Sequence, residues 1–297
     1  MSALEEIHPI LHGGAMPILA VANRSWNNGK DLYQPPCELL LDIDRYRAER
    51  RGKNPRKVLL QMESPEIEQT LEYQRTHGAE YDLILTYHEE ILQRFPHARR
   101  SLFAHSWIAP EDYRAVDSSR KKPAASFPVG AKVQTSGHRY RQVLLQNHWL
   151  LNRAFPMTFF TSWDWNPPLI SQKLPQDQAG KRVLFGEFQF SLVVENCRHE
   201  NYFTEKLIDC LLMRSLPIFW GTPNIDLFFD TAGWIILETM DPEEVLQKLS
   251  AIPDGHYARH AASIDANHQK SLRMNNYTRW VGEALEEAFP GGRWPLA

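Results

Sequence analysis

The sequence has little cysteine, no long apolar run and no surplus of basic charge. Its cysteines are Cys37, Cys197 and Cys210. An odd, sparse set of this kind does not describe a disulfide framework, and it suits a reducing compartment. No apolar run approaches the roughly 20 residues that a membrane-spanning helix requires. The net charge of −3 lacks the basic balance typical of nucleic-acid-binding domains. We therefore expect neither a disulfide-stapled protein nor a transmembrane or nucleic-acid-binding one.

Internal repeats and a basic leader are also missing. The chain begins MSALEEIHPI, which is acidic where a signal peptide would be basic. Its 297 residues, 43% hydrophobic and 23% charged, are typical of a globular protein with one large or two medium domains.

A strand–helix–strand pattern runs from Phe188 to Pro223. The apolar, β-branched run 188–194 predicts a buried strand, and Leu216 to Trp220 predicts a second one. Between them, Thr204 is a suitable N-cap for a helix with apolar residues at helical spacing. Such units form parallel sheets with right-handed crossovers, so the pattern indicates an α/β fold.

Polar residues stand where such a sheet binds ligands. Glu195 and Asn196 follow the first strand, and Tyr202, Glu205 and Lys206 cluster at the predicted helix N-terminus. Open α/β sheets bind ligands beyond the carboxyl ends of their strands, and helix N-termini favour anions. These residues fit a phosphate at Lys206 and a ribose diol at Glu205. The alternative is an ordinary N-cap followed by solvated charges.

The whole stretch, ENCRHENYFTEKLIDC followed by LPIFWGTP, resembles the donor-site signature of the α1,3-fucosyltransferases of glycosyltransferase family 10. The Glu-Asn pair, the Tyr-x-Thr-Glu-Lys run and the Pro-Ile-x-Trp-Gly-x-Pro strand occur in order and at similar spacing. Cys197 departs from the serine that is usual in the family. The resemblance implies a GT-B fold, in which two Rossmann-like α/β domains face a cleft. It also implies an inverting transfer of fucose from GDP-fucose to a glycan hydroxyl.

The resemblance assigns roles to residues elsewhere in the chain. Lys57 to Met62 predicts a buried strand that ends in Glu63-Ser64-Pro65. Family 10 enzymes are similar here, and their glutamate is the general base, so Glu63 inherits that role. From the residues alone, without the downstream signature, a solvated acid in a strand-end turn is the preferred interpretation of Glu63.

An arginine of the second half would grip the donor diphosphate by the same resemblance. We expect a strand at 131–135 and a helix from about Arg139 to Leu151. Arg139 and Arg141 both compete for the role, and they face different sides of a helix. We favour Arg141. The expected donor-binding set is then Arg141, Arg139, Asn196, Tyr202, Glu205 and Lys206.

The polar, proline-marked stretch Asp117 to Pro128 reads as a linker. We therefore expect an acceptor-side domain over residues 1–122 and a donor-binding domain over 123–297, with the last helix crossing back to the first domain. Helices are expected at 37–51 and 256–289, a strand at 17–22, and a long loop at 163–180.

No metal or cofactor is expected beyond the donor, because Lys206 and an arginine supply positive charge, and Mn²⁺ would stimulate only modestly. Asp42 and Asp44 form the aspartate pair that other sugar transferases use for a metal, but here the pair lies in a helical pattern.

Animal family members carry a Golgi anchor that is missing here, so we expect a cytoplasmic enzyme, at most peripheral to the inner membrane face. The acceptor would be a glycan, free or lipid-linked. Another nucleotide sugar as donor, and a non-catalytic carbohydrate-binding protein on this fold, remain alternatives.

Overall fold

The computed structural model describes residues 38–41, 57–102, 104–162, 171–173, 178–275 and 277–290. They form two compact units, and each is considered by itself. Unit 1 comprises the residues up to 103 together with those from Asn276 onward, and unit 2 runs from Ala104 to Asn275.

Unit 1 is a four-stranded sheet with helices. Its strands run in the order β1-β2-β3-β4, and all neighbours are parallel. In chain order its elements are β1 (Glu38–Leu41), β2 (Lys57–Leu60), α3 (Pro65–Glu68), α4 (Thr70–His77), the 3₁₀ turn η2 (Gly78–Glu80), β3 (Leu83–Thr86), α5 (Glu89–Arg94), β4 (Ala98–Arg100) and α14 (Tyr277–Ala288).

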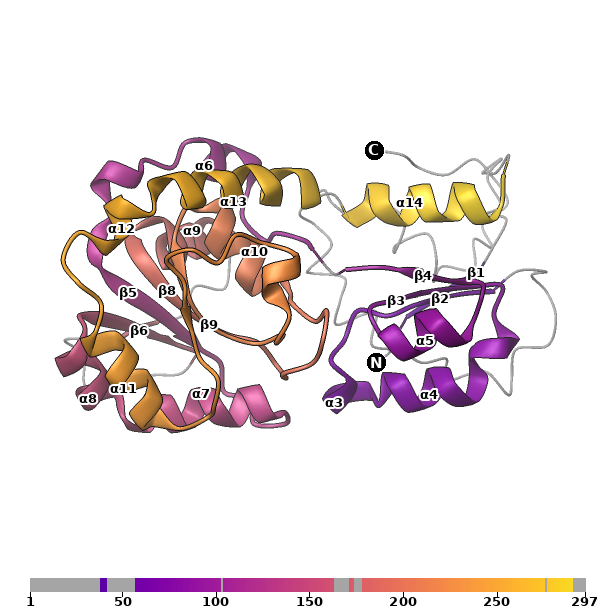
Figure 1. The fold of residues 1–297 in the computed structure, drawn as a ribbon, viewed down its shortest axis with the longest axis horizontal. Coiled ribbons are helices and arrows are strands. Elements are labelled where there is room, and N and C mark those ends of the chain that lie inside the picture. Colours follow the sequence, from indigo (N-terminus) through magenta and orange to yellow (C-terminus); the bar gives the residue numbers. More distant parts are fainter. Residues whose placement is uncertain are drawn as a thin grey trace. The chain divides into compact units, whose positions relative to one another are not determined.

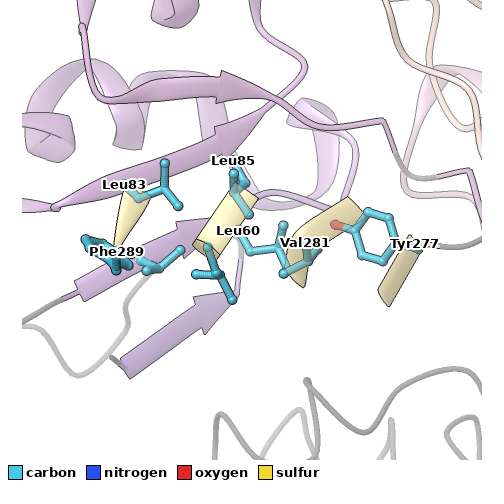
Figure 2. Close-up of a cluster of buried hydrophobic side chains, with 8 residues drawn as sticks. Leu60, Leu83, Leu85, Tyr277, Val281 and Phe289 are labelled. Atoms are coloured by element: carbon cyan, nitrogen blue, oxygen red, sulfur yellow. The ribbon is translucent and has the colours of Figure 1, made fainter. Parts of the chain in front are cut away.

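Alternating side chains of β2 and β3 build the core of unit 1 on both faces of the sheet. Leu59 and Ile84 pack with Ile91 of α5, whereas the intervening residues face α14. Figure 2 shows this second cluster, which joins Val58, Leu60, Leu83 and Leu85 to Tyr277, Val281, Leu285 and Phe289. The last helix therefore belongs to the sheet of the first half of the chain.

Unit 2 is a six-stranded parallel sheet with strand order β10-β9-β8-β5-β6-β7. Helices cover both of its faces, with α7, α8 and α11 on one and α9, α10 and α13 on the other (Figure 1). In chain order its elements are α6 (Pro110–Arg114), η3 (Ser118–Arg120), β5 (Lys122–Val129), α7 (Ser136–Gln146), α8 (His148–Ala154), β6 (Met157–Thr161), β7 (Ser171–Lys173), α9 (Gln178–Gly186), β8 (Phe188–Val194), α10 (Glu205–Leu212), β9 (Leu216–Trp220), η4 (Ile225–Leu227), β10 (Ile235–Ile236), α11 (Pro242–Ser250), α12 (His256–Arg259) and α13 (Ala261–Met274).

The central strand–helix–strand prediction agrees with β8, α10 and β9. The Thr204 hydroxyl accepts a hydrogen bond from the Lys206 N–H, as an N-cap does. The apolar face of α10 is buried. The helix therefore has a fixed direction, with its N-terminus at the carboxyl edge of the sheet.

The expected linker over 117–128 is wrong. Residues 122–129 form β5, which pairs with both β6 and β8. Proline cannot donate to a sheet ladder and is confined to irregular positions. Pro123 lies where the register between β5 and β8 shifts. The strand expected at 131–135 is instead the connection from β5 to α7.

The division between the units falls between residues 103 and 104 rather than after 122. The segment that follows residue 103 is fastened to unit 2 through Asp209 of α10. The Asp209 carboxylate accepts hydrogen bonds from Ser106 Oγ at 2.6 Å and from the Trp107 N–H at 3.0 Å.

Two other expectations differ from the structure. Residues 38–41, expected to be helical, form β1, and part of the expected loop 163–180 forms β7 and the start of α9. The strand expected at 17–22 and the pair Asp42 and Asp44 lie outside the described residues.

Candidate functional site

The order of strands in unit 2 reverses between β5 and β8. From β5 the chain builds β6 and β7 on one side of the sheet, and then β8, β9 and β10 on the other. Open α/β sheets bind ligands beyond the carboxyl ends of their strands at such a reversal. The connections that leave these two strands lead into α7 and α10. The candidate site is therefore built from the starts of two helices.

Gly137 seats the first turn of α7 against the end of β8. Its N–H donates to the Asn196 carbonyl at 2.9 Å. A Cβ at this position would lie 1.7 Å from the Glu195 carbonyl oxygen, so only glycine allows this approach. The N-terminus of α7 is thereby held beside Glu195 and Asn196.

Arg141 and Arg139 occupy different environments. Arg141 is buried, and its guanidinium donates to the Val194 carbonyl and, at 3.0 Å, to Asn196 Oδ1. Arg139 is exposed and donates to the Gln134 carbonyl at 3.0 Å. Arg141 is therefore part of the frame at the end of β8, whereas Arg139 lies at the surface of the same helix.

Glu195 fixes the start of α10. Its carboxylate is fully buried and accepts hydrogen bonds from the Thr204 N–H at 2.8 Å and the Thr204 hydroxyl at 2.7 Å. Burial raises the pKa of Glu195, and Lys206 opposes that rise. The sequence placed Glu195 at a strand end without assigning it a role. Its signal was an acid directly after an apolar strand and a capping threonine farther along the chain.

Glu205 and Lys206 complete an ionic cluster. Lys206 Nζ lies 2.9 Å from Glu205 Oε1, 3.1 Å from Thr204 Oγ1 and 3.9 Å from Glu195 Oε2. Burial raises the pKa of Glu205, but Lys206 and Lys181 more than offset it, so the pKa falls to about 2. Burial lowers the pKa of Lys206, but Glu205 and Glu195 outweigh it and the pKa is raised. Both groups are therefore ionised at neutral pH.

Arg141, Glu195, Glu205 and Lys206 act on one another electrostatically, and we call them the charged corner. Burial lowers the pKa of Arg141, while Glu195 and Glu205 oppose this. Arg141 in turn lowers the pKa of Lys206. The predicted residues Arg141, Asn196, Glu205 and Lys206 thus come together in one place. Tyr202 is buried beside them, close enough for its phenol to act on the pKa of Arg141.

A second group of side chains borders the charged corner at Glu205. His105 is buried, which lowers its pKa, and the Glu205 carboxylate acts in the opposite direction. Lys181 of α9 has its ammonium 5.1 Å from the Trp107 ring centroid, and it acts on Glu205. The segment after residue 103 and α9 therefore lie next to the charged corner.

Glu63 belongs to unit 1, where it follows β2 and is exposed. The Tyr87 hydroxyl donates to the Glu63 carbonyl at 2.8 Å. The next residue, Ser64, is fully buried and caps α3 by accepting from the Glu66 N–H. The backbone around Glu63 is therefore held while its carboxylate stays at the surface.

A buried network of polar side chains begins at Gln61, directly after β2. Gln61 Nε2 lies 2.8 Å from His88 Nε2, Gln61 Oε1 accepts from Gln74 at 3.0 Å, and Thr86 donates to both Gln61 and Gln74. Every member is almost fully buried: Gln61, Thr70, Gln74, Thr86 and His88. Sequence reasoning missed this network, because glutamine and threonine near strand ends are not distinguished from surface residues.

The described residues contain no group of three or more His, Cys, Asp or Glu side chains arranged to hold a metal ion. Within the same residues, no helix combines the length and apolar character needed to cross a bilayer.

Comparison with known proteins finds one family model that matches part of unit 2. Residues 168–262 match the family model described as glycosyltransferase family 10 (fucosyltransferase) C-term. The chain is 31% identical over 66 residues to an alpha-(1,3)-fucosyltransferase, FucT, of Helicobacter pylori, a match that spans 22% of this chain and 14% of that protein. It is 22% identical over 118 residues to GDP-fucose protein O-fucosyltransferase 3 of Danio rerio, over 39% of this chain and 26% of that one. Both matches thus cover a minor part of the relatives' length.

A solved structure extends the likeness to most of the chain. The crystal structure of an alpha1,3-fucosyltransferase superposes with a TM-score of 0.52 at 15% identity, covering 82% of this chain and 78% of that one. At this identity the likeness establishes the fold. The chain therefore has the α/β architecture of the GT-B fold, and residues 168–262 of its second unit resemble the C-terminal part of glycosyltransferase family 10, the fucosyltransferase family.

Proposed function

We propose that this protein is an inverting glycosyltransferase, α1,3-fucosyltransferase-like, that transfers fucose from GDP-fucose to a hydroxyl of a glycan acceptor. One observation carries the proposal: Arg141, Lys206 and Glu205 meet at the strand-order reversal of a family 10 domain. GDP-fucose as donor draws support from the family description and from the name of the Danio rerio relative.

Each member of the charged corner has a role in holding the donor. Lys206 and Arg141 face the diphosphate, with Arg139 adding charge from the surface of α7. Glu205, ionised and mostly buried, accepts hydrogen bonds from the ribose diol in exchange for its contact with Lys206. Asn196 and Tyr202 line the same place. Glu195 does not reach the donor, because its oxygens are held by Thr204.

The reaction is a single displacement at the anomeric carbon of fucose. The acceptor oxygen forms a bond to that carbon as the bond to the diphosphate oxygen breaks, and the electron pair leaves with GDP. Glu63 takes the proton of the acceptor hydroxyl, which is typically worth ~10²–10⁴ in rate. Lys206, Arg141 and the helix N-termini stabilise the charge that develops on the diphosphate.

Positive charge from the protein takes the place that a divalent cation fills in other transferases. We propose that no metal is required and that Mn²⁺ changes the rate only modestly. The acceptor is a glycan, free or lipid-linked, and the enzyme works in the cytoplasm, at most peripherally at the inner membrane face.

Substitution of Glu63 tests the proposal. Glu63→Gln should reduce transfer from GDP-fucose by at least about 100-fold, while GDP still raises the melting temperature as in the parent, because a ligand of the folded state stabilises it. Glu66→Gln, an exposed neighbour on α3, is the matched control and should transfer normally. Unimpaired transfer by Glu63→Gln would remove it as the base. A larger melting shift with UDP- or ADP-sugars than with GDP-fucose would replace the donor.

A further inference from the structure

His138 is a buried histidine in the first turn of α7 that the sequence analysis assigned no role. It forms a capping box with Thr135: the His138 N–H donates to Thr135 Oγ1 at 3.2 Å, and the Thr135 N–H donates to His138 Nδ1 at 3.3 Å. Glutamate or glutamine usually occupies this position of a capping box. A histidine there performs the same capping and leaves a second ring nitrogen available.

The capping box determines where the imidazole carries its proton. A backbone N–H can only donate, so Nδ1 must be the acceptor, and the single hydrogen of the neutral ring lies on Nε2. Thr135 Oγ1, 2.8 Å from Nδ1, can donate to the same nitrogen. Only 6% of His138 is exposed. In the part of the chain that the structure describes, its hydrogen bonds all go to Thr135, which leaves Nε2–H as a donor without a protein acceptor.

Positive charges surround this donor. Burial and, after it, the charges of Arg141, Lys206, Lys132 and Arg139 together lower the pKa of His138 to about 4. The ring is therefore neutral at pH 7. An additional cation here would be repelled by its neighbours in the unliganded protein. A neutral imidazole instead offers a hydrogen-bond donor that adds no charge.

An anion is the ligand that satisfies both the donor and the surrounding cations. Building on the function proposed above, we propose that His138 binds the diphosphate of the donor through Nε2–H, with the Thr135 capping box holding the ring in the required tautomer and orientation. His138 is then a binding residue for the leaving group, at the N-terminus of α7, beside Arg141 and Lys206.

Nitrogen-15 NMR of histidine-labelled protein tests this directly. In the free protein His138 should be the Nε2–H tautomer. His268 is an internal control of the opposite kind, since it is buried and its Nδ1 lies 2.8 Å from the Leu212 carbonyl, which requires hydrogen on Nδ1. Addition of GDP should shift the His138 Nε2 signal along a saturable curve, over GDP concentrations that also raise the melting temperature, and leave His268 unchanged.

Two variants that preserve the capping box distinguish the loss of a contact with GDP from a loss of stability. His138→Glu keeps the cap and adds a carboxylate at a helix N-terminus, so the protein should be at least as stable as the parent. Its GDP affinity should fall by at least about 10-fold, the scale of a lost charge-assisted hydrogen bond. His138→Gln keeps the cap without a charge and should lose less. Gln134→Glu adds the same charge to the exposed connection before α7, and its loss should be clearly smaller than that of His138→Glu.

The outcomes separate this proposal from the function on which it rests. GDP binding without a shift of His138, or equal losses in His138→Glu and Gln134→Glu, would overturn the role of His138 and leave the transferase intact. If GDP does not bind but inorganic pyrophosphate shifts His138, the nucleotide is wrong and the diphosphate role stands. If neither ligand moves the signal, the proposal fails.

Discussion

Both units gather polar side chains near the carboxyl ends of parallel strands, but the buried ones of unit 1 are mainly glutamine and threonine, whereas those of unit 2 are mainly acids and bases. The network of Gln61, Thr86 and His88 is almost fully buried, and its side chains are joined to one another by hydrogen bonds. The charged corner leaves the Lys206 side chain 27% exposed. Neutral groups can be buried once their hydrogen bonds are made, whereas buried ions also need counter-charges.

The two units also differ in the order of their strands. The described strands of unit 1 follow one another across the sheet, whereas those of unit 2 reverse between β5 and β8. The charge lies at the reversal, where α/β sheets take up ligands. This difference in charge and strand order is what the function proposed for unit 2 requires. In unit 1, the Tyr87 hydroxyl holds the backbone of one exposed acid, Glu63.

The largest effect on stability is expected when the charged corner loses one ion. Lys206→Met leaves Glu195 fully buried, and Glu205 mostly buried, without their shared ammonium. Breaking a buried ion set costs ~3–5 kcal/mol. Because Lys206 is partly exposed, we expect unit 2 to lose about 2–3 kcal/mol in free energy of unfolding. Hydrogen exchange of the α10 amides measures this loss.

Lys122→Met is the control for that experiment within the same unit. Lys122 pairs with Glu187 at 2.6 Å, both side chains are about half exposed, and such exposed pairs contribute only ~0.2–1 kcal/mol. If the two variants were equally stable, the corner would be no more than a set of solvated charges.

A smaller effect on stability is expected from a substitution in unit 1. Tyr87→Phe removes the hydroxyl that holds the Glu63 carbonyl. Stability should fall by about 1 kcal/mol, the usual net worth of a hydrogen bond. Misplacing a catalytic group is costly in rate, so kcat for fucosyl transfer should fall about 10-fold while KM for the donor stays constant.

Tyr73→Phe provides the comparison within unit 1. The Tyr73 hydroxyl pairs with that of Tyr81, so this variant should lose similar stability and keep its kcat. Equal kcat in the two variants would mean that Tyr87 supports the fold alone.

The parts of the fold that the sequence predicted are those where local signals agree with burial. β8 is an apolar run, and the cap at Thr204 and the apolar face of α10 both point to the same helix. β5 was missed because its lysine and prolines resemble a linker, and only pairing on both sides reveals it as a strand. Tertiary contacts that overrule local composition are not visible in a single sequence.

The sequence predicted directly only those candidate-site residues that lie close together along the chain. Asn196, Glu205 and Lys206 lie close along the chain and were found. The family pattern placed an arginine on α7, but helical spacing could not tell that Arg141 is buried and Arg139 exposed. The role proposed for His138 was not predicted. It depends on a capping box and on nearby cations from both α7 and α10, and neither can be seen in the sequence.

The amino end of the unit 2 sheet offers the smallest and most specific test. Lys121 is buried there, and its ammonium donates to the carbonyls of Phe185 and Phe188 and to Ser215 Oγ at 2.6, 3.0 and 3.0 Å. Burial lowers the pKa of Lys121 to about 7. Unlike Lys206, it has no carboxylate among its described hydrogen-bond partners.

The pH dependence of stability follows from that lowered pKa. Between pH 7 and the ordinary lysine value of 10.5, the unfolded chain binds a proton that the folded protein lacks, so this group makes stability rise with pH. The rise should approach ~1.4 kcal/mol per pH unit in the parent and be absent in Lys121→Met, whose carbonyls keep the Ser215 hydroxyl as donor. Urea unfolding at pH 7, 8 and 9 measures the difference. Lys122→Met, at an exposed lysine paired with Glu187, should retain the parent's slope, and an identical slope in Lys121→Met would show that Lys121 stays charged in the fold.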